Sequence, residues 1–161
     1  MNILHCIYSL AISCWLGGMT LFTFVLTPTL FASYSRDVAG GIVGILFPGY
    51  FRFSLTCGAV ALLCQLIRKG RFAMASLVII GAMLLLTAVQ AFVIEPHATA
   101  LKRSIASFET TSPDDPSRIQ FRKLHGISMA ANLAVIAGGV VLVVLATFQY
   151  ASGSTPSRLK F

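Results

Sequence analysis

Charged residues are scarce in this sequence, and their absence from long stretches decides its class. Only 11% of the 161 residues are charged and 57% are hydrophobic, against about 25% and 45–50% in soluble domains. No Asp, Glu, Lys or Arg occurs within residues 1–35, 53–67, 72–94 or 124–157. So little charge cannot build a water-facing shell, and a disordered chain requires low hydrophobicity. We therefore exclude both classes and expect a small integral membrane protein.

Four apolar stretches are long enough to cross a bilayer, whose hydrocarbon core of about 30 Å requires roughly 20 helical residues. We expect spans at about 3–26, 50–67, 72–94 and 124–148. Pro48 and Gly49 predict a break or kink before the second span, and the third is expected to stop at Glu95-Pro96. The predicted fold is all-α: one transmembrane domain over residues 1–150, an antiparallel up-down four-helix bundle with a long loop between its third and fourth helices. A polar tail over residues 151–161 follows.

Basic residues lie at the ends of the spans and give a formal net charge of +7. Such residues anchor helix ends and contact anionic lipid, so the expected partner is the lipid bilayer and no nucleic acid is inferred. Four spans place both termini on one side of the membrane. We call this the hairpin side, since it carries the tight basic turn at residues 68–71; the loop side carries the first and third loops. The basic hairpin favours cytoplasmic termini, and the short loops suit a bacterial inner membrane.

Three ionisable residues fall at a similar depth on the loop side. Arg52 lies just inside the second span, Glu95 ends the third and His125 opens the fourth. An ionisable group at the edge of the hydrocarbon is costly unless it is paired. Two interpretations stay open for Arg52 and Glu95: an ion pair, or separate extension of each side chain to the lipid headgroups.

The fourth span carries a polar stripe made of His125, Ser128 and Asn132, whose spacing of three and four residues places them on one helix face. Trp15 and Gln90 fall in the same loop-side half of the membrane. A buried indole N–H needs an acceptor, for which Asn132 and Gln90 are candidates. The stripe is explained either by hydrogen bonds that hold the helices together or by a cavity open to the loop side.

Metal-binding and catalytic patterns are weak. His97, His125 and Glu95 offer a His/His/carboxylate set, but no close spacing such as H-E-x-x-H is present. The cysteines pair by depth across the first two spans, Cys6 with Cys64 and Cys14 with Cys57. Thiolates bind soft metals, although a buried cysteine is commonly a small apolar residue. With no nucleophile–base pair, P-loop or carboxylate dyad, we expect no enzyme, no catalytic residue, no metal site and no cofactor.

Several ordered motifs resemble the transmembrane protein 205-like family, whose bacterial members are labelled as a domain of unknown function. The matching residues are Trp15-x-Gly17, Leu46-Phe47-Pro48-x-Tyr50-Phe51, Glu95-Pro96 with Thr99-Ala100, and Phe121-Arg122-x-x-His125-Gly126-x-Ser128-x-x-x-Asn132-Leu133. The resemblance implies a four-helix membrane protein with a long third loop and no assigned reaction. It places the family's recurrent polar positions at Trp15, Glu95, His125, Ser128 and Asn132. Arg52 departs from the family pattern, and the cysteines are not part of it.

The leading functional hypothesis is a polar pocket on the loop side that binds or passes a small polar solute or ion. Its predicted residues are Trp15, Arg52, Glu95, His125, Ser128 and Asn132. The first alternative is a non-transporting interaction protein. The small-xxx-small motif Gly40-x-x-x-Gly44 allows close helix contact and would support a homo-oligomer. The third hypothesis is a haem or metal carrier.

Overall fold

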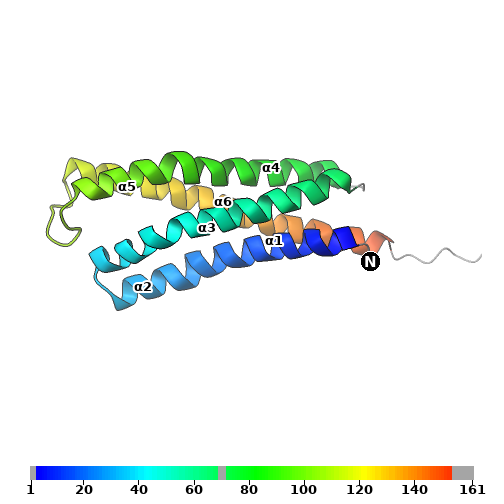
Figure 1. The fold of residues 1–161 in the computed structure, drawn as a ribbon, viewed down its shortest axis with the longest axis horizontal. Coiled ribbons are helices and arrows are strands. Elements are labelled where there is room, and N and C mark those ends of the chain that lie inside the picture. Colours follow the sequence, from blue (N-terminus) through cyan, green and yellow to red (C-terminus); the bar gives the residue numbers. More distant parts are fainter. Residues whose placement is uncertain (1–2, 69–71, 154–161) are drawn as a thin grey trace, which may run out of the picture.

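The structure is a computed structural model that describes residues 3–68 and 72–153, and all regular elements in these ranges are helical (Figure 1). The first long helix comprises α1 (Ile3–Leu21), the π-helical segment η1 (Phe22–Leu26) and α2 (Thr27–Ser33). The second is α3 (Arg36–Ile67), the third comprises α4 (Ala73–Val89), η2 (Gln90–Ile94) and α5 (Glu95–Ser104), and the fourth is α6 (Pro116–Gly153). Each is long and apolar enough to cross a membrane, so the prediction of an all-α, multi-pass four-helix bundle is confirmed.

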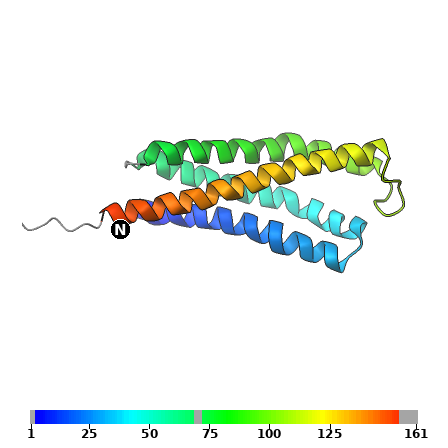
Figure 2. The ribbon, with the colours of Figure 1, turned by 180° about the vertical axis from the view of Figure 1, so that it is seen from behind.

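The four helices alternate in direction. Helix α1 packs against α3 and α6, and α4 packs against the same two helices. The turn between α2 and α3 lies at the same end of the bundle as the loop between α5 and α6, and the N-terminus lies at the opposite end (Figures 1 and 2). The arrangement therefore has the loop side and hairpin side expected from the sequence. Residues 69–71 of the predicted hairpin and 154–161 of the predicted tail lie outside the described residues.

All four helices extend beyond the predicted spans on the loop side. The first continues to Ser33, the second begins at Arg36, the third continues to Ser104 and the fourth begins at Pro116. Helix α3 runs through Pro48, so the break expected there is wrong. Hydropathy marks only the part of a helix that lies in hydrocarbon, whereas a 32-residue helix such as α3 is about 48 Å long. The loop-side ends therefore project beyond the hydrocarbon.

The first and third helices continue past their predicted ends through one proline each, Pro28 and Pro96. Proline lacks the N–H that bonds four residues back, and local π-type adjustment accommodates this loss within membrane helices. The residue before each proline bonds five residues back instead: Thr27 N–H to the Phe22 carbonyl, and Glu95 N–H to the Gln90 carbonyl. In a regular α-helix, residues five apart are separated by about 140° around the axis. The wider π-turn reduces this angle, so Gln90 and Glu95 face the same side.

The hydrophobic core fills the middle and the hairpin-side half of the bundle. Its buried residues include Tyr8, Ile12, Trp15, Met19, Ile80, Met83, Val135 and Leu142. Toward the loop side, α3 diverges from α5 (Figures 1 and 2), and α3 carries Gly40, Gly41 and Gly44 in this region. Small residues on diverging helices leave space between them. This space is the cavity described next.

Candidate functional site

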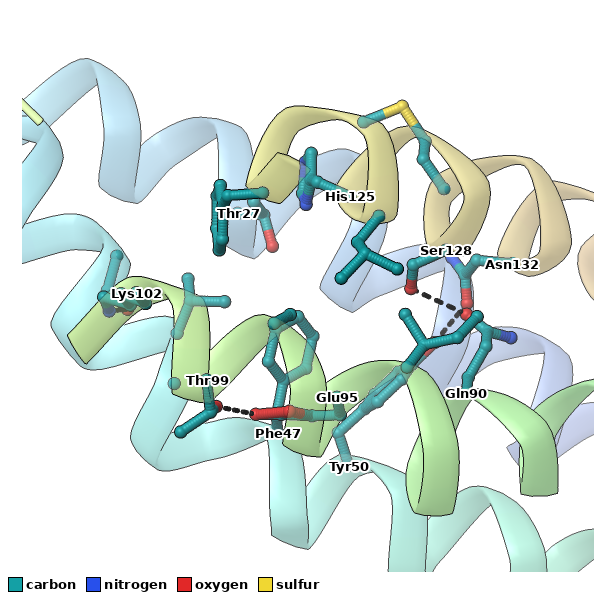
Figure 3. A pocket seen from close by; sticks show the side chains of 18 of the residues that line it. Thr27, Phe47, Tyr50, Gln90, Glu95, Thr99, Lys102, His125, Ser128 and Asn132 are labelled. Atoms are coloured by element: carbon teal, nitrogen blue, oxygen red, sulfur yellow. Dashed lines mark hydrogen bonds between the residues drawn. The ribbon is translucent and has the colours of Figure 1, made fainter. Parts of the chain in front are cut away.

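A cavity of about 540 Å³ lies between the four helices on the loop side (Figure 3). This volume falls within the range of about 300–1,000 Å³ that is typical of small-molecule sites. Seven aromatic residues line the wall: Phe22, Phe31, Phe47, Tyr50, Phe51, Phe108 and Phe121. Its polar side chains include Thr23, Gln90, Glu95, Lys102, His125, Ser128 and Asn132. Both π-helical segments contribute to the lining, which is consistent with the frequent occurrence of π-bulges at functional sites.

A hydrogen-bonded network closes the deep end of the cavity. The Tyr50 hydroxyl donates to Asn132 Oδ1 at 2.5 Å, and Asn132 Nδ2 donates to Thr23 Oγ1 at 2.7 Å. These bonds join the first, second and fourth helices. Asn132 therefore has partners for both ends of its amide, and its interactions match the interhelical role considered for the polar stripe.

Two polar atoms in the wall have no partner. Ser128 Oγ donates to Gln90 Oε1 at 3.1 Å, while Gln90 Nε2 is buried and makes no hydrogen bond in the described structure. Thr99 Oγ1 donates to Glu95 Oε1 at 2.8 Å, while Glu95 Oε2 is likewise buried and unbonded. Gln90 is only 2% exposed. Leaving such a group unsatisfied costs about 1–3 kcal/mol, and more when it is charged, so the polar part of the wall has hydrogen-bonding capacity that the described residues do not use.

Asp37 fixes the loop between α5 and α6 over one end of the cavity. Ser107 Oγ donates to Asp37 Oδ2 at 2.6 Å, and the Phe108 backbone N–H donates to Asp37 Oδ1 at 2.8 Å. The Phe108 ring then packs edge-on against Phe121, with their centroids 5.0 Å apart, and Phe121 stacks on His125 at 6.1 Å. The loop thus places an aromatic side chain in the cavity wall.

Lys102 occupies the groove made by Gly40 and Gly44. Its Nζ donates to the Gly40 carbonyl at 2.5 Å, and a Cβ at Gly40 or Gly44 would lie 3.5 or 3.7 Å from the same nitrogen. The small-xxx-small motif therefore faces α5 inside the monomer and accepts a lysine side chain. Self-association through Gly40 and Gly44 stays a prediction, because the contacts of this motif described here lie within one chain.

Four of the six predicted site residues come together in the cavity wall: Glu95, His125, Ser128 and Asn132. In Figure 3, Glu95 and Thr99 lie on one rim, and His125 lies on the opposite one. The shared helix face expected for the α6 stripe is therefore observed.

Arg52 and Trp15 do not line the cavity. Arg52 is exposed because it lies about 140° around α3 from the cavity-lining Phe47, and within the described residues it forms no ion pair with Glu95. Trp15 is fully buried in the core against Gly58, and neither Asn132 nor Gln90 accepts a hydrogen bond from its Nε1. Close packing, rather than a polar partner, holds the indole.

Sequence reasoning missed Thr23, Tyr50, Lys102 and the ring-lined wall, and it considered Gln90 only as an acceptor for Trp15. The available signal was proline. Pro28 and Pro96 follow directly on the predicted first and third spans, and a proline disturbs the backbone hydrogen bonds of the preceding turn. Both predicted spans end just before these prolines, although the chain stays helical through them.

The residues considered for metal binding are dispersed. Within residues 3–68 and 72–153, no three His, Cys, Asp or Glu side chains group closely enough to hold an ion. His97 is exposed, and its Nδ1 lies 2.7 Å from the Val93 carbonyl. All four cysteines are free; Cys6 and Cys14 are exposed, and Cys64 is buried.

Comparison with known proteins identifies the family. No solved structure gives a significant match. An uncharacterised protein of Aquifex aeolicus is 32% identical over 125 residues, which cover 78% of this chain and 83% of that protein. The profile of a domain of unknown function, DUF4149, matches residues 10–107, a segment that contains both π-helical segments and the α3 and α5 walls of the cavity. The chain therefore belongs to the family defined by this domain of unknown function.

Proposed function

We propose that this membrane protein binds a small molecule with a hydrogen-bonding group in the loop-side cavity. The observation that carries the proposal is a 540 Å³ cavity whose wall contains Gln90 and Glu95, each of which has one buried side-chain atom without a hydrogen-bond partner. Gln90 Nε2 is a donor, and Glu95 Oε2 is an acceptor when the carboxyl is ionised. Rotation of these side chains would bring both atoms to a ligand in the cavity, and the hydrogen bonds so formed would offset the cost of leaving them unbonded.

The structure supports binding better than free passage. The Tyr50–Asn132–Thr23 network closes the deep end of the cavity, and Trp15 and its neighbours fill the core beyond it. Passage of a solute would require this close-packed half to open. We therefore favour a binding role without catalysis, and we keep transport as a further step that needs a second conformation.

Access to the cavity is best explained from the side between α2 and α6. On the side between α3 and α5, Lys102 bonds to Gly40, and Asp37 holds the loop at Ser107 and Phe108. Between α2 and α6, the lining residues Phe31 and Met129 are 46% and 50% exposed. A bilayer covers such an apolar surface, so a ligand reaches the cavity from the membrane or its interface.

The test is to fill the cavity and measure ligand binding. Ala98 lines the cavity from α5, and Ala98→Phe would occupy the space next to Glu95 and Thr99. Val89→Phe is the matched control, because Val89 is 40% exposed and does not line the cavity. Small polar and amphipathic compounds are titrated into detergent-purified protein while thermal unfolding is followed.

We expect some compounds to stabilise the wild type and the Val89 variant but not the Ala98 variant. His125→Ala should weaken the same binding, because its ring borders the cavity. Equal stabilisation of the filled variant, or no stabilisation of the wild type by any compound, would show that the cavity is not a binding site.

We also infer the finer placement of the protein. The motifs described above support similarity to the transmembrane protein 205-like family, and the Aquifex relative supports residence in a bacterial inner membrane. The basic hairpin supports cytoplasmic termini. A reporter fused to the C-terminus, active only in the cytoplasm or only in the periplasm, tests the orientation directly.

A further inference from the structure

Resting on this proposed function, we propose that the ligand is an organic cation, with an ammonium group attached to an apolar or aromatic body. The first argument is charge. Glu95 is the one acidic side chain among the described lining residues, and its buried Oε2 has no partner. Glu95 as a whole is half-buried, and an ionised carboxylate with one oxygen removed from solvent is stabilised by a nearby cation. Within the described residues no ion pair with Glu95 is present.

The basic side chains that line the cavity are Arg36, Lys102 and His125. Lys102 Nζ bonds to the Gly40 carbonyl, and it lies seven residues beyond Glu95 on the same helix, a rise of about 10 Å. Arg36 is exposed at the loop-side start of α3, and His125 lies on the opposite rim from Glu95 (Figure 3). Within the described residues none of the three forms an ion pair with Glu95, so a bound cation would supply the charge that Glu95 lacks.

The second argument is the aromatic wall beside this carboxylate. Figure 3 shows Phe47 beside Glu95, with Tyr50 next along the wall. The rings form one cluster: Phe22 and Tyr50 have centroids 4.5 Å apart, and Phe47 and Phe51 have centroids 5.6 Å apart. Aromatic faces attract ammonium groups that lie within about 6 Å of the ring centre. A carboxylate combined with several ring faces suits an organic cation better than a hydrated metal ion or an anion.

The third argument is the position of Gln90. Segment η2 turns Gln90 and Glu95 toward the same side. The Gln90 amide nitrogen has no partner, and it points away from Glu95 (Figure 3). Rotation of the amide would bring this donor toward a hydrogen-bond acceptor, such as a hydroxyl or carbonyl oxygen, near the cationic nitrogen. The expected ligand therefore combines an ammonium group, an adjacent acceptor and an apolar body that contacts the rings.

Three probes of nearly equal size separate the charge classes: 2-phenylethylammonium, 2-phenylethanol and phenylacetate. Each is titrated at pH 7 into full-length protein in detergent, and its dissociation constant is measured by calorimetry. The ammonium probe should bind at least about tenfold more tightly than the alcohol, a difference that corresponds to about 1.4 kcal/mol. Phenylacetate should bind most weakly.

Glu95→Gln should remove this preference by weakening the ammonium probe at least about tenfold, while the affinity for the alcohol changes little. Glu109→Gln is the matched control, because Glu109 is an exposed loop residue outside the cavity and should leave all three affinities unchanged. If Glu95→Gln does not fold, Phe47→Leu provides a second test. Loss of that ring face should weaken the ammonium probe selectively.

The outcomes distinguish the ligand class from the site. If the alcohol or phenylacetate binds as tightly as the ammonium probe, and Ala98→Phe abolishes that binding, the cation assignment is wrong while the cavity stands. If no probe binds the wild type, the cation assignment is contradicted, while the stabilisation measurements with the wider set of compounds decide whether the cavity is a binding site. An ammonium preference that survives both Glu95→Gln and Phe47→Leu would also refute the cation assignment, because the preference would then arise elsewhere.

Discussion

Gly58 of α3 packs against Trp15 of α1 and Leu84 of α4, and its replacement by alanine tests the packing of the core. A Cβ at this position would lie 2.5 Å from Leu84 Cδ2, and 2.7 and 2.8 Å from two ring atoms of Trp15. Leu84 can rotate, but Trp15 is 0% exposed and has no free space to move into. The whole indole, and with it part of α1, must shift by several tenths of an ångström.

The expected cost follows from two opposing effects. Forcing an extra carbon into a packed core costs about 1–3 kcal/mol, and replacing a helical glycine with alanine returns about 0.5–1 kcal/mol. Strain should dominate here because three atoms are affected, so we expect a net loss of about 1–2 kcal/mol. For a chain of this length, that loss lowers the unfolding temperature by roughly 2–8 °C.

Trp15 is the chain's only tryptophan, so its fluorescence reports directly on this contact during thermal unfolding in detergent. Gly81→Ala is the matched control, because a Cβ there meets nothing within 4 Å. It should leave the unfolding temperature unchanged or raise it slightly, owing to the better helix propensity of alanine. If Gly58→Ala unfolds at the wild-type temperature or above it, the close contact between Trp15 and Gly58 is wrong.

Three further perturbations test the site. Asp37→Ala should release the loop at Phe108, so that chymotrypsin cleaves there faster than in the wild type. Asp114→Ala, at an exposed loop residue, is the control and should be cleaved at the wild-type rate. Equal rates in all three proteins would show that Asp37 does not hold the loop. Tyr50→Phe removes the bond to Asn132 and should lower stability by about 0.6 kcal/mol, measured as denaturation by SDS; no loss would mean that the bond contributes nothing. Pro96→Ala restores an N–H and should allow η2 to become α-helical, which would turn the Glu95 carboxylate away from the cavity. We expect the ammonium probe to bind at least about tenfold more weakly, corresponding to 1.4 kcal/mol. Unchanged affinity would refute a role for the π-turn.

The candidate site was predicted from the depth of each residue in the membrane, that is, from its position along its predicted span. It correctly placed Glu95, His125, Ser128 and Asn132 near one another, because rise per residue is nearly constant in a helix. It misplaced Arg52 and Trp15, because depth alone does not specify the direction in which a side chain points around the helix axis. Arg52 faces outward and Trp15 lies in the core, although both are on the expected helices.

The sequence by itself determined that this chain crosses a membrane four times, because uncharged stretches of this length can be buried only in hydrocarbon. It also determined the alternating topology, since consecutive segments that each cross the membrane run in opposite directions. Tertiary structure alone decided the helix rotations, the filling of the Gly40–Gly44 groove by Lys102, and the two π-turns that line the cavity. These features depend on contacts between residues far apart in the chain. A hydropathy pattern depends only on neighbouring residues in the sequence, so it cannot predict such contacts.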